Sequence, residues 1–249
     1  MKRSGISVLA GLCAVATSAM AAEIRVLSAG AVEPGLHAFA EQVKRDLGHD
    51  LKIIYNTTPQ ITKRLAAGEV YDIVILPPAA IEQAVKDGKA AADTRAPLGR
   101  VGAGIVVRAG APIPDVVTVE GLKRALLAAD SVVYNSASSG LYLDKLFAKM
   151  GVLEEIKPKT TRYPDARPVM EHVIKGKGNE IGFGPVTEIK PHEGKGLTYA
   201  GPLPAEVQNY TSYDAALMTG APAADAAKAV LRQLATPAGK AAFVSAGVE

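Results

Sequence analysis

The stretch PLGRVGAGIVVR, residues 97–108, separates two parts of the chain that have the same pattern. Its first four residues end a series of short apolar strands and helices, and residues 101–108 form an apolar segment interrupted by glycine. Such a segment suits an extended strand that passes from one folding unit to another. We therefore predict one lobe from residues 22–97 and 202–249 and a second lobe from residues 98–201.

Short apolar strands alternate with amphipathic helices on both sides of this stretch. The expected strands are residues 23–28, 51–55, 71–76, 131–134, 160–163, 180–184 and 214–219. This alternation is typical of an α/β fold with largely parallel sheets. A return crossing is expected at residues 198–201, because Pro202 and Pro204 follow them. Two crossings predict a hinge and a ligand cleft between the lobes.

The first 21 residues have the pattern of a cleavable export signal. Lys2 and Arg3 precede an apolar run at residues 6–16, and AMA at residues 19–21 fits a cleavage site. Cys13, the single cysteine, lies in this segment, so we expect a soluble periplasmic protein without disulfides. Cleavage leaves 28 − 2 = 26 basic residues against 25 acidic ones. This balance gives no broad basic face for nucleic acid.

Motifs for catalysis, metals or cofactors are not visible in the sequence. It has no Gly-x-Ser-x-Gly elbow, His-Glu-x-x-His pair, cysteine pair or Walker loop. The four histidines are scattered outside the expected cleft loops: His37, His49, His172 and His192. We therefore expect a protein that is not an enzyme and needs no cofactor. A secreted hydrolase with Ser138 or Ser139 as nucleophile is the alternative from another class, because triad members meet only in space.

Three junctions between a strand and a helix carry small or hydroxylated residues. They are SAGA at residues 28–31, NTT at 56–58 and SASSG at 136–140. The first N–H groups of a helix lack partners, and the helix dipole adds positive charge there, so such ends hold anions. Thr58 and Ser139 could equally be ordinary N-caps. Three such junctions at the carboxyl ends of strands indicate a ligand cleft, with these candidates: Ser28, Gly30, Ala31, Thr57, Thr58, Ser138 and Ser139.

Two further candidates lie at later turns. Arg167 follows a predicted strand, and its guanidinium could clamp a carboxylate or phosphate, or could pair with Asp165 or Glu171. Gly184 and Pro185 could let the backbone approach a ligand closely, or could simply end a strand.

Six stretches, in this order and spacing, resemble the molybdate-binding receptors of ABC importers, which are type 2 periplasmic binding proteins. They are VLSAGA (26–31), YNTTPQI (55–61), LAAGEVYDI (65–73), SSGLY (138–142), DAR (165–167) and TPAGKAAF (236–243). The resemblance implies a two-lobed fold, a small anionic ligand and an inner-membrane ABC permease as partner. We also expect a monomer.

The ligand positions differ from the molybdate pattern at two places. The resemblance aligns the first-loop serine with Ala31 and a site tyrosine with Pro185, while Thr57, Thr58 and Ser139 keep hydroxyls. Each lost donor would leave an oxyanion oxygen underbonded, at about 1–3 kcal/mol. Arg167 makes a small organic carboxylate a second candidate ligand, and the receptor could then serve import or sensing.

Overall fold

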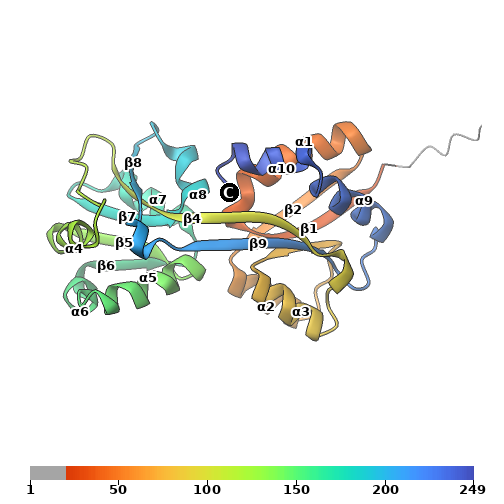
Figure 1. Cartoon of the computed structure of the whole chain (residues 1–249), viewed down its shortest axis with the longest axis horizontal. Helices are drawn as coiled ribbons and strands as arrows, with labels where there is room; N and C mark the ends of the chain where they lie inside the picture. Colours follow the sequence, from red (N-terminus) through yellow and green to blue (C-terminus); the bar gives the residue numbers. More distant parts are fainter. Residues whose placement is uncertain (1–20) are drawn as a thin grey trace, which may run out of the picture.

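Two α/β lobes joined by two long strands make up residues 21–249, the part that the computed structural model describes (Figure 1). Strands β4 (Ala96–Arg108) and β9 (Tyr210–Leu217) run side by side and antiparallel between the lobes. Of the predicted leader, only Ala21 lies within the described residues. In this described part, no helix has the length and apolar character that a bilayer crossing requires.

One nine-stranded sheet runs through both lobes in the order β2-β1-β3-β9-β4-β7-β5-β6, with β8 also paired to β4. The remaining strands are β1 (Glu23–Ala29), β2 (Asp50–Asn56), β3 (Ile73–Leu76), β5 (Ser131–Asn135), β6 (Thr160–Tyr163), β7 (Glu180–Pro185) and β8 (Leu197–Pro202). Strand β1 pairs in parallel with β2 and β3, and β5 pairs in parallel with β6 and β7, whereas the pairs formed by β4 and β9 are antiparallel. Parallel strands end at the same edge, so the loops after them converge between the lobes.

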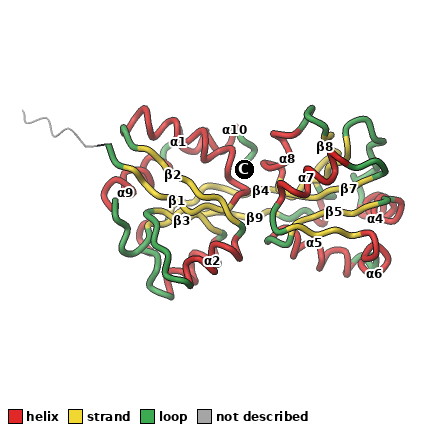
Figure 2. Tube along the Cα trace, turned by 180° about the vertical axis from the view of Figure 1, so that it is seen from behind, coloured by secondary structure: helices red, strands yellow, loops and turns green. Residues whose placement is uncertain are grey.

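Helices cover both faces of the sheet in each lobe (Figure 2). The first lobe carries α1 (Glu33–Leu47), α2 (Thr58–Ala66), α3 (Pro78–Lys86), α9 (Ala224–Leu234) and α10 (Pro237–Ser245). The second carries α4 (Val119–Ala128), α5 (Ser138–Lys149), α6 (Leu153–Ile156), α7 (Ala166–Lys175) and α8 (Val186–Ile189). Each lobe buries its own apolar core, so each is held by its own hydrophobic contacts. The two-lobed α/β fold expected from the sequence is confirmed.

The return crossing lies later in the chain than predicted. Residues 198–201 belong to β8, which pairs with β4 inside the second lobe. Leu203 is buried in the second core, so the prolines on either side end a strand and do not mark the hinge. Strand β9 carries the chain back. The lobe boundaries at residues 97/98 and 201/202 stay a prediction.

The start of α2 also differs from the expectation by one residue. Thr57, not Thr58, is the N-cap, and its N–H donates to the Gln60 side-chain oxygen at 2.8 Å. This reciprocal cap places Thr58 and Pro59 in the first turn, where a missing proline N–H costs nothing. The side chain of Thr58 therefore remains available for other contacts.

Candidate functional site

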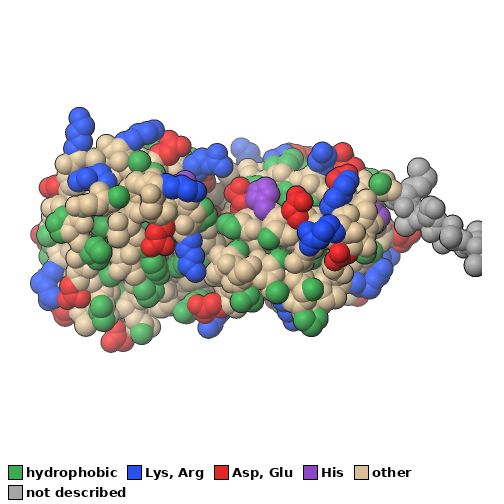
Figure 3. Space-filling model, turned by 90° about the horizontal axis from the view of Figure 1, so that it is seen from above, with side chains coloured by type: hydrophobic (Ala, Val, Ile, Leu, Met, Phe, Trp, Pro, Cys, Tyr) green, Lys and Arg blue, Asp and Glu red, His purple; other side chains and the backbone are tan. Residues whose placement is uncertain are grey.

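A cavity of about 720 Å³ lies between the lobes, where the loops after β1, β2, β5, β6 and β7 meet. Figure 3 looks onto the molecule from above and shows a hollow between the two halves. Lys and Arg side chains lie on the rim of one half, and acidic and His side chains lie on the rim of the other (Figure 3). The convergence follows from the parallel strand order, because each loop leaves the carboxyl end of its strand.

Eight of the ten predicted site residues line this cavity. They are Gly30, Ala31, Thr57, Thr58, Ser138, Ser139, Arg167 and Pro185. Ser28 and Gly184 do not line it. The Ser28 side chain is buried in β1, and its hydroxyl donates to the Ala29 carbonyl at 3.0 Å. Gly184 pairs with Gly104 of β4 inside the sheet.

Asn135, at the end of β5, is a polar group that sequence reasoning did not single out. Its side chain is buried (3% exposed) and lines the cavity. Its Oδ1 accepts the Ala137 N–H at 3.0 Å and the Ser139 hydroxyl at 3.3 Å. These bonds fix the amide orientation and leave Nδ2 as the end that can donate to a ligand.

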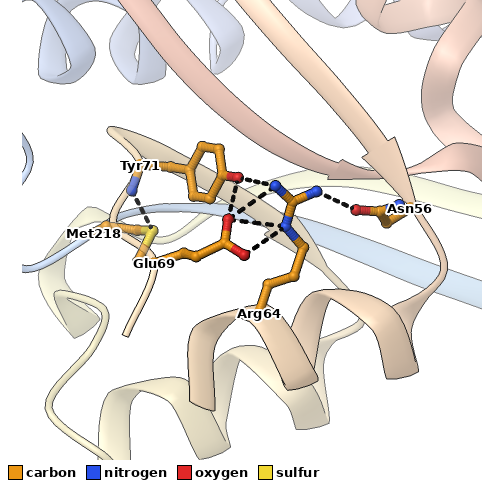
Figure 4. A network of polar contacts seen from close by, with 5 residues as sticks. All are labelled: Asn56, Arg64, Glu69, Tyr71 and Met218. Atoms are coloured by element: carbon orange, nitrogen blue, oxygen red, sulfur yellow. Dashed lines mark hydrogen bonds and ion pairs between the residues drawn. The ribbon is translucent and has the colours of Figure 1, made fainter. Parts of the chain in front are cut away.

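Asn56 occupies the matching position at the end of β2. Its Oδ1 accepts from Nη1 of Arg64 at 2.9 Å, and Glu69 and Tyr71 hold that arginine in turn (Figure 4). Asn56 lines the cavity, so here too Nδ2 is the free donor. The two lobes thus present one amide donor each, next to the N-termini of α2 and α5.

Arg167 supplies an unpaired positive charge at the second-lobe side of the cavity. It is exposed in the first turn of α7, and its backbone N–H donates to the N-cap Asp165 at 3.2 Å. Its guanidinium makes no ion pair within residues 21–249, and Glu171 pairs with Lys175 instead. The alternative that Arg167 pairs with Asp165 or Glu171 is therefore not what the structure contains.

Histidines contribute to the cavity, contrary to the expectation that they lie outside it. His37 on α1 lines it, 3.5 Å from Glu33 and with its ring 5.5 Å from that of Tyr55, and His192 lines it as well. The buried Tyr55 hydroxyl has no hydrogen-bond partner among the described residues. The sequence did not reveal the position of His37, because this residue lies on one side of α1 and not in a loop that follows a strand.

Glu188 is a carboxyl of the cavity whose pKa is strongly shifted. It lies in α8, directly after β7, and is mostly buried. Burial, together with the negative charges of Glu33 and Asp165, raises its pKa to about 8. Sequence reasoning ended at Pro185 because a four-residue helix shows no hydrophobic period. A carboxyl with this pKa can donate and accept a proton near neutral pH.

The raised pKa makes a prediction about stability. Glu188→Gln should leave the free energy of unfolding almost unchanged below pH 4.5 and raise it by about 1–3 kcal/mol at pH 9, allowing for partial solvent screening. A group with a raised folded-state pKa stabilises below its unfolded value and loses that contribution as pH rises through about 8. Melting curves of both proteins across this pH range check it. An equal shift at both ends of the range would contradict the assignment.

The serines proposed as nucleophiles of a hydrolase have no histidine base beside them among the described residues. Within residues 21–249, neither Ser138 nor Ser139 has a histidine within hydrogen-bond distance, and Ser139 instead donates to Asn135. His172 does contact a serine, Ser131, at 3.3 Å, but neither residue lines the cavity. The described residues also include no group of three or more side chains suited to a metal ion.

Residues 24–249 match the sequence profile of the bacterial extracellular solute-binding proteins. This chain belongs to that family. Membership in this family agrees with the two lobes and the central cavity of the solute-binding protein.

A curated relative corrects the expectation that this solute-binding protein is not an enzyme. The aconitate isomerase of a Pseudomonas species is 31% identical to it over 251 residues, covering 97% of this chain and 94% of the relative. A full-length relative with an enzyme's name contradicts that expectation. That expectation rested on the lack of known catalytic motifs in the sequence, and such a lack does not exclude an enzyme.

Solved structures of a molybdate-binding and a sulfate-binding protein share the fold. The periplasmic molybdate-binding protein of Azotobacter vinelandii superimposes with a TM-score of 0.76 at 15% identity, covering 91% of this chain and 98% of that one. The sulfate-binding protein of Mycobacterium tuberculosis gives a TM-score of 0.72 at 19% identity, covering 91% and 86%. Identities this low establish the architecture and leave the ligand open.

Proposed function

We propose that this protein binds aconitate, a small tricarboxylate, in the cleft between its lobes and interconverts its cis and trans isomers. The observation that carries the proposal is a cavity that combines anion donors with an acid–base group. The donors are Arg167 and the amides of Asn56 and Asn135, and the acid–base group is a mostly buried carboxyl. The Pseudomonas relative supports the choice of substrate.

The cavity favours a polycarboxylate over a tetrahedral oxyanion. A volume of about 720 Å³ far exceeds what one oxyanion fills, and its donors come from loops in both lobes. Ala31 and Pro185 offer no side-chain donor. A guanidinium binds the planar carboxylate bidentately, which fixes the orientation of a flexible organic anion.

Isomerisation of aconitate requires no cofactor. Its methylene group lies between a carboxylate and a carbon–carbon double bond, so removal of a methylene proton leaves a delocalised anion. Return of a proton to the other end of that system moves the double bond and can change its geometry. The helix N-termini and Arg167 would stabilise the extra negative charge once the lobes close on the ligand.

Delivery of the bound anion to an inner-membrane ABC permease is a second candidate function. The observation that favours it is the solute-binding family itself, together with a cavity placed at the junction of two lobes joined by β4 and β9. Membership in an extracellular solute-binding family supports a periplasmic location for either function, after removal of the predicted leader. Closure of the lobes on the ligand would serve either one.

The experiment that tests the proposal mixes the purified protein with trans-aconitate and follows the appearance of cis-aconitate. Competition with molybdate and with simple dicarboxylates in the same assay ranks the ligand classes. We expect conversion that dicarboxylates inhibit and molybdate does not. Binding of molybdate without turnover of aconitate would contradict the proposal.

A further inference from the structure

Glu188 is the one carboxyl of the cavity for which the structure provides no partner. Glu33 lies 3.5 Å from His37, and Asp165 caps α7 by accepting the Arg167 N–H. Within residues 21–249, the carboxylate of Glu188 makes no hydrogen bond and no ion pair, although it is mostly buried and lines the cavity. A carboxyl so placed is available to a ligand in the cavity.

The hydrogen bonding and close packing of α8 against the first lobe fix the position of Glu188. The neighbouring Thr187 is fully buried, and its hydroxyl donates to the Ala31 carbonyl at 2.5 Å, which ties α8 to the loop after β1. A Cβ atom added to Gly30 would lie 3.2 Å from Oε1 of Glu188. The carboxyl therefore lies over a residue without a side chain, at the floor of the cleft where both lobes meet.

The charged and titratable groups around Glu188 set its proton affinity. Glu33 and His37 come from α1, Asp165 and Arg167 from the start of α7, His192 from the turn after α8, and Tyr213 from β9. Burial and the two neighbouring carboxylates favour the protonated form. The other elements packed against α8, namely β4, β7 and the loop at Gly30–Val32, add no charged side chain to the cavity.

We infer that Glu188 is the catalytic residue that moves the proton in the isomerisation, an inference that rests on the proposed function. Its carboxylate takes a proton from the methylene carbon of aconitate and becomes the acid. The electron pair of that C–H bond forms a new double bond to the central carbon, and the old double bond shifts its pair to the far carbon. That carbon then takes a proton from the Glu188 acid, so the carboxylate is restored and no oxidant or reductant is needed.

The test compares Glu188→Gln with Glu171→Gln, the same change on the exposed face of α7. Glu188→Gln keeps the shape of the protonated acid but cannot move the proton. We expect its kcat to fall about 1,000-fold, with the calorimetric Kd for aconitate within a few-fold of wild type. Glu171→Gln should retain the wild-type kcat. Glu188→Asp, which withdraws the carboxylate by one carbon, should retain partial activity.

A pH profile separates proton transfer from a structural role. In the wild type, kcat/KM should rise with pH and level off above about 8, because the carboxylate form is the base. Glu33→Gln removes one neighbouring negative charge and so lowers the pKa of Glu188. The rise of kcat/KM should therefore occur at lower pH. A structural Glu188 would give no such shift.

The possible outcomes distinguish the two proposals. A wild-type protein that does not convert aconitate overturns both the proposed function and the role of Glu188. A wild-type protein that converts it, with a Glu188→Gln variant retaining more than a tenth of that kcat, overturns the role of Glu188 alone. In that case, loss of activity in His37→Gln would assign the proton transfer to the His37 and Glu33 pair on α1 instead.

Discussion

Arg167→Ala is expected to weaken the binding of aconitate by about 2–5 kcal/mol, because a buried charge pair loses one partner. Arg167 is the exposed, unpaired cation at the cavity, and closure of the lobes would remove its pair with a carboxylate from water. Arg167→Lys should bind with intermediate affinity, since an ammonium cannot reproduce two parallel hydrogen bonds. Isothermal calorimetry on the three proteins measures both effects.

Arg124→Ala is the matched control for this prediction. Arg124 is also exposed and lies in the second lobe, but it pairs with Asp115 and does not line the cavity. Its removal should leave the affinity for aconitate within a factor of two or so of wild type. Tight binding of molybdate or tungstate that survives Arg167→Ala would instead restore the oxyanion as the ligand.

Gly140→Ala is expected to destabilise the protein by about 3 kcal/mol or more, as severe overpacking does. A Cβ atom at Gly140 would lie within 1.7 Å of the Asn135 carbonyl oxygen, a backbone atom that cannot turn aside. The first turn of α5 must then move away from β5. This displacement would also break the bonds that orient the Asn135 amide, so aconitate affinity should fall together with stability.

Gly184→Ala provides the control for this second prediction. The nearest atom to its added Cβ is Cε of Met170, at 3.0 Å, which a flexible side chain can withdraw. We expect a loss below about 1 kcal/mol in denaturant unfolding. Equal losses of unfolding free energy for Gly140→Ala and Gly184→Ala would contradict the prediction. They would show that stability does not depend on the close approach of α5 to β5.

The residues that sequence reasoning located share one property: they lie next to each other in the chain at the end of a strand. Thr57 and Ser139 follow strands whose apolar pattern is plain, and the parallel order then brings them to one cavity. The N-cap of α2 is Thr57, one residue before the predicted Thr58. The cause is that the Gln60 side chain, and not the proline, decides where α2 begins.

The residues that sequence reasoning missed act across long separations. His37 faces the cavity from the side of α1, and Glu188 belongs to a helix of four residues that has no pattern of its own. The hydrogen bond from Thr187 to Ala31 joins residues 156 positions apart. Local propensity and spacing contain no signal for such contacts, so Glu188 could be placed at the cavity only by the structure.

The most direct test of the central claim is proton NMR of trans-aconitate in the presence of the purified protein. The signals of cis-aconitate should grow at a rate proportional to protein concentration and reach the same ratio when the reaction starts from the cis isomer. Calorimetry on the same sample establishes whether the protein binds aconitate. Saturable binding of aconitate without any conversion, at pH 7 and at pH 9, would contradict the account and leave a receptor that only binds its ligand.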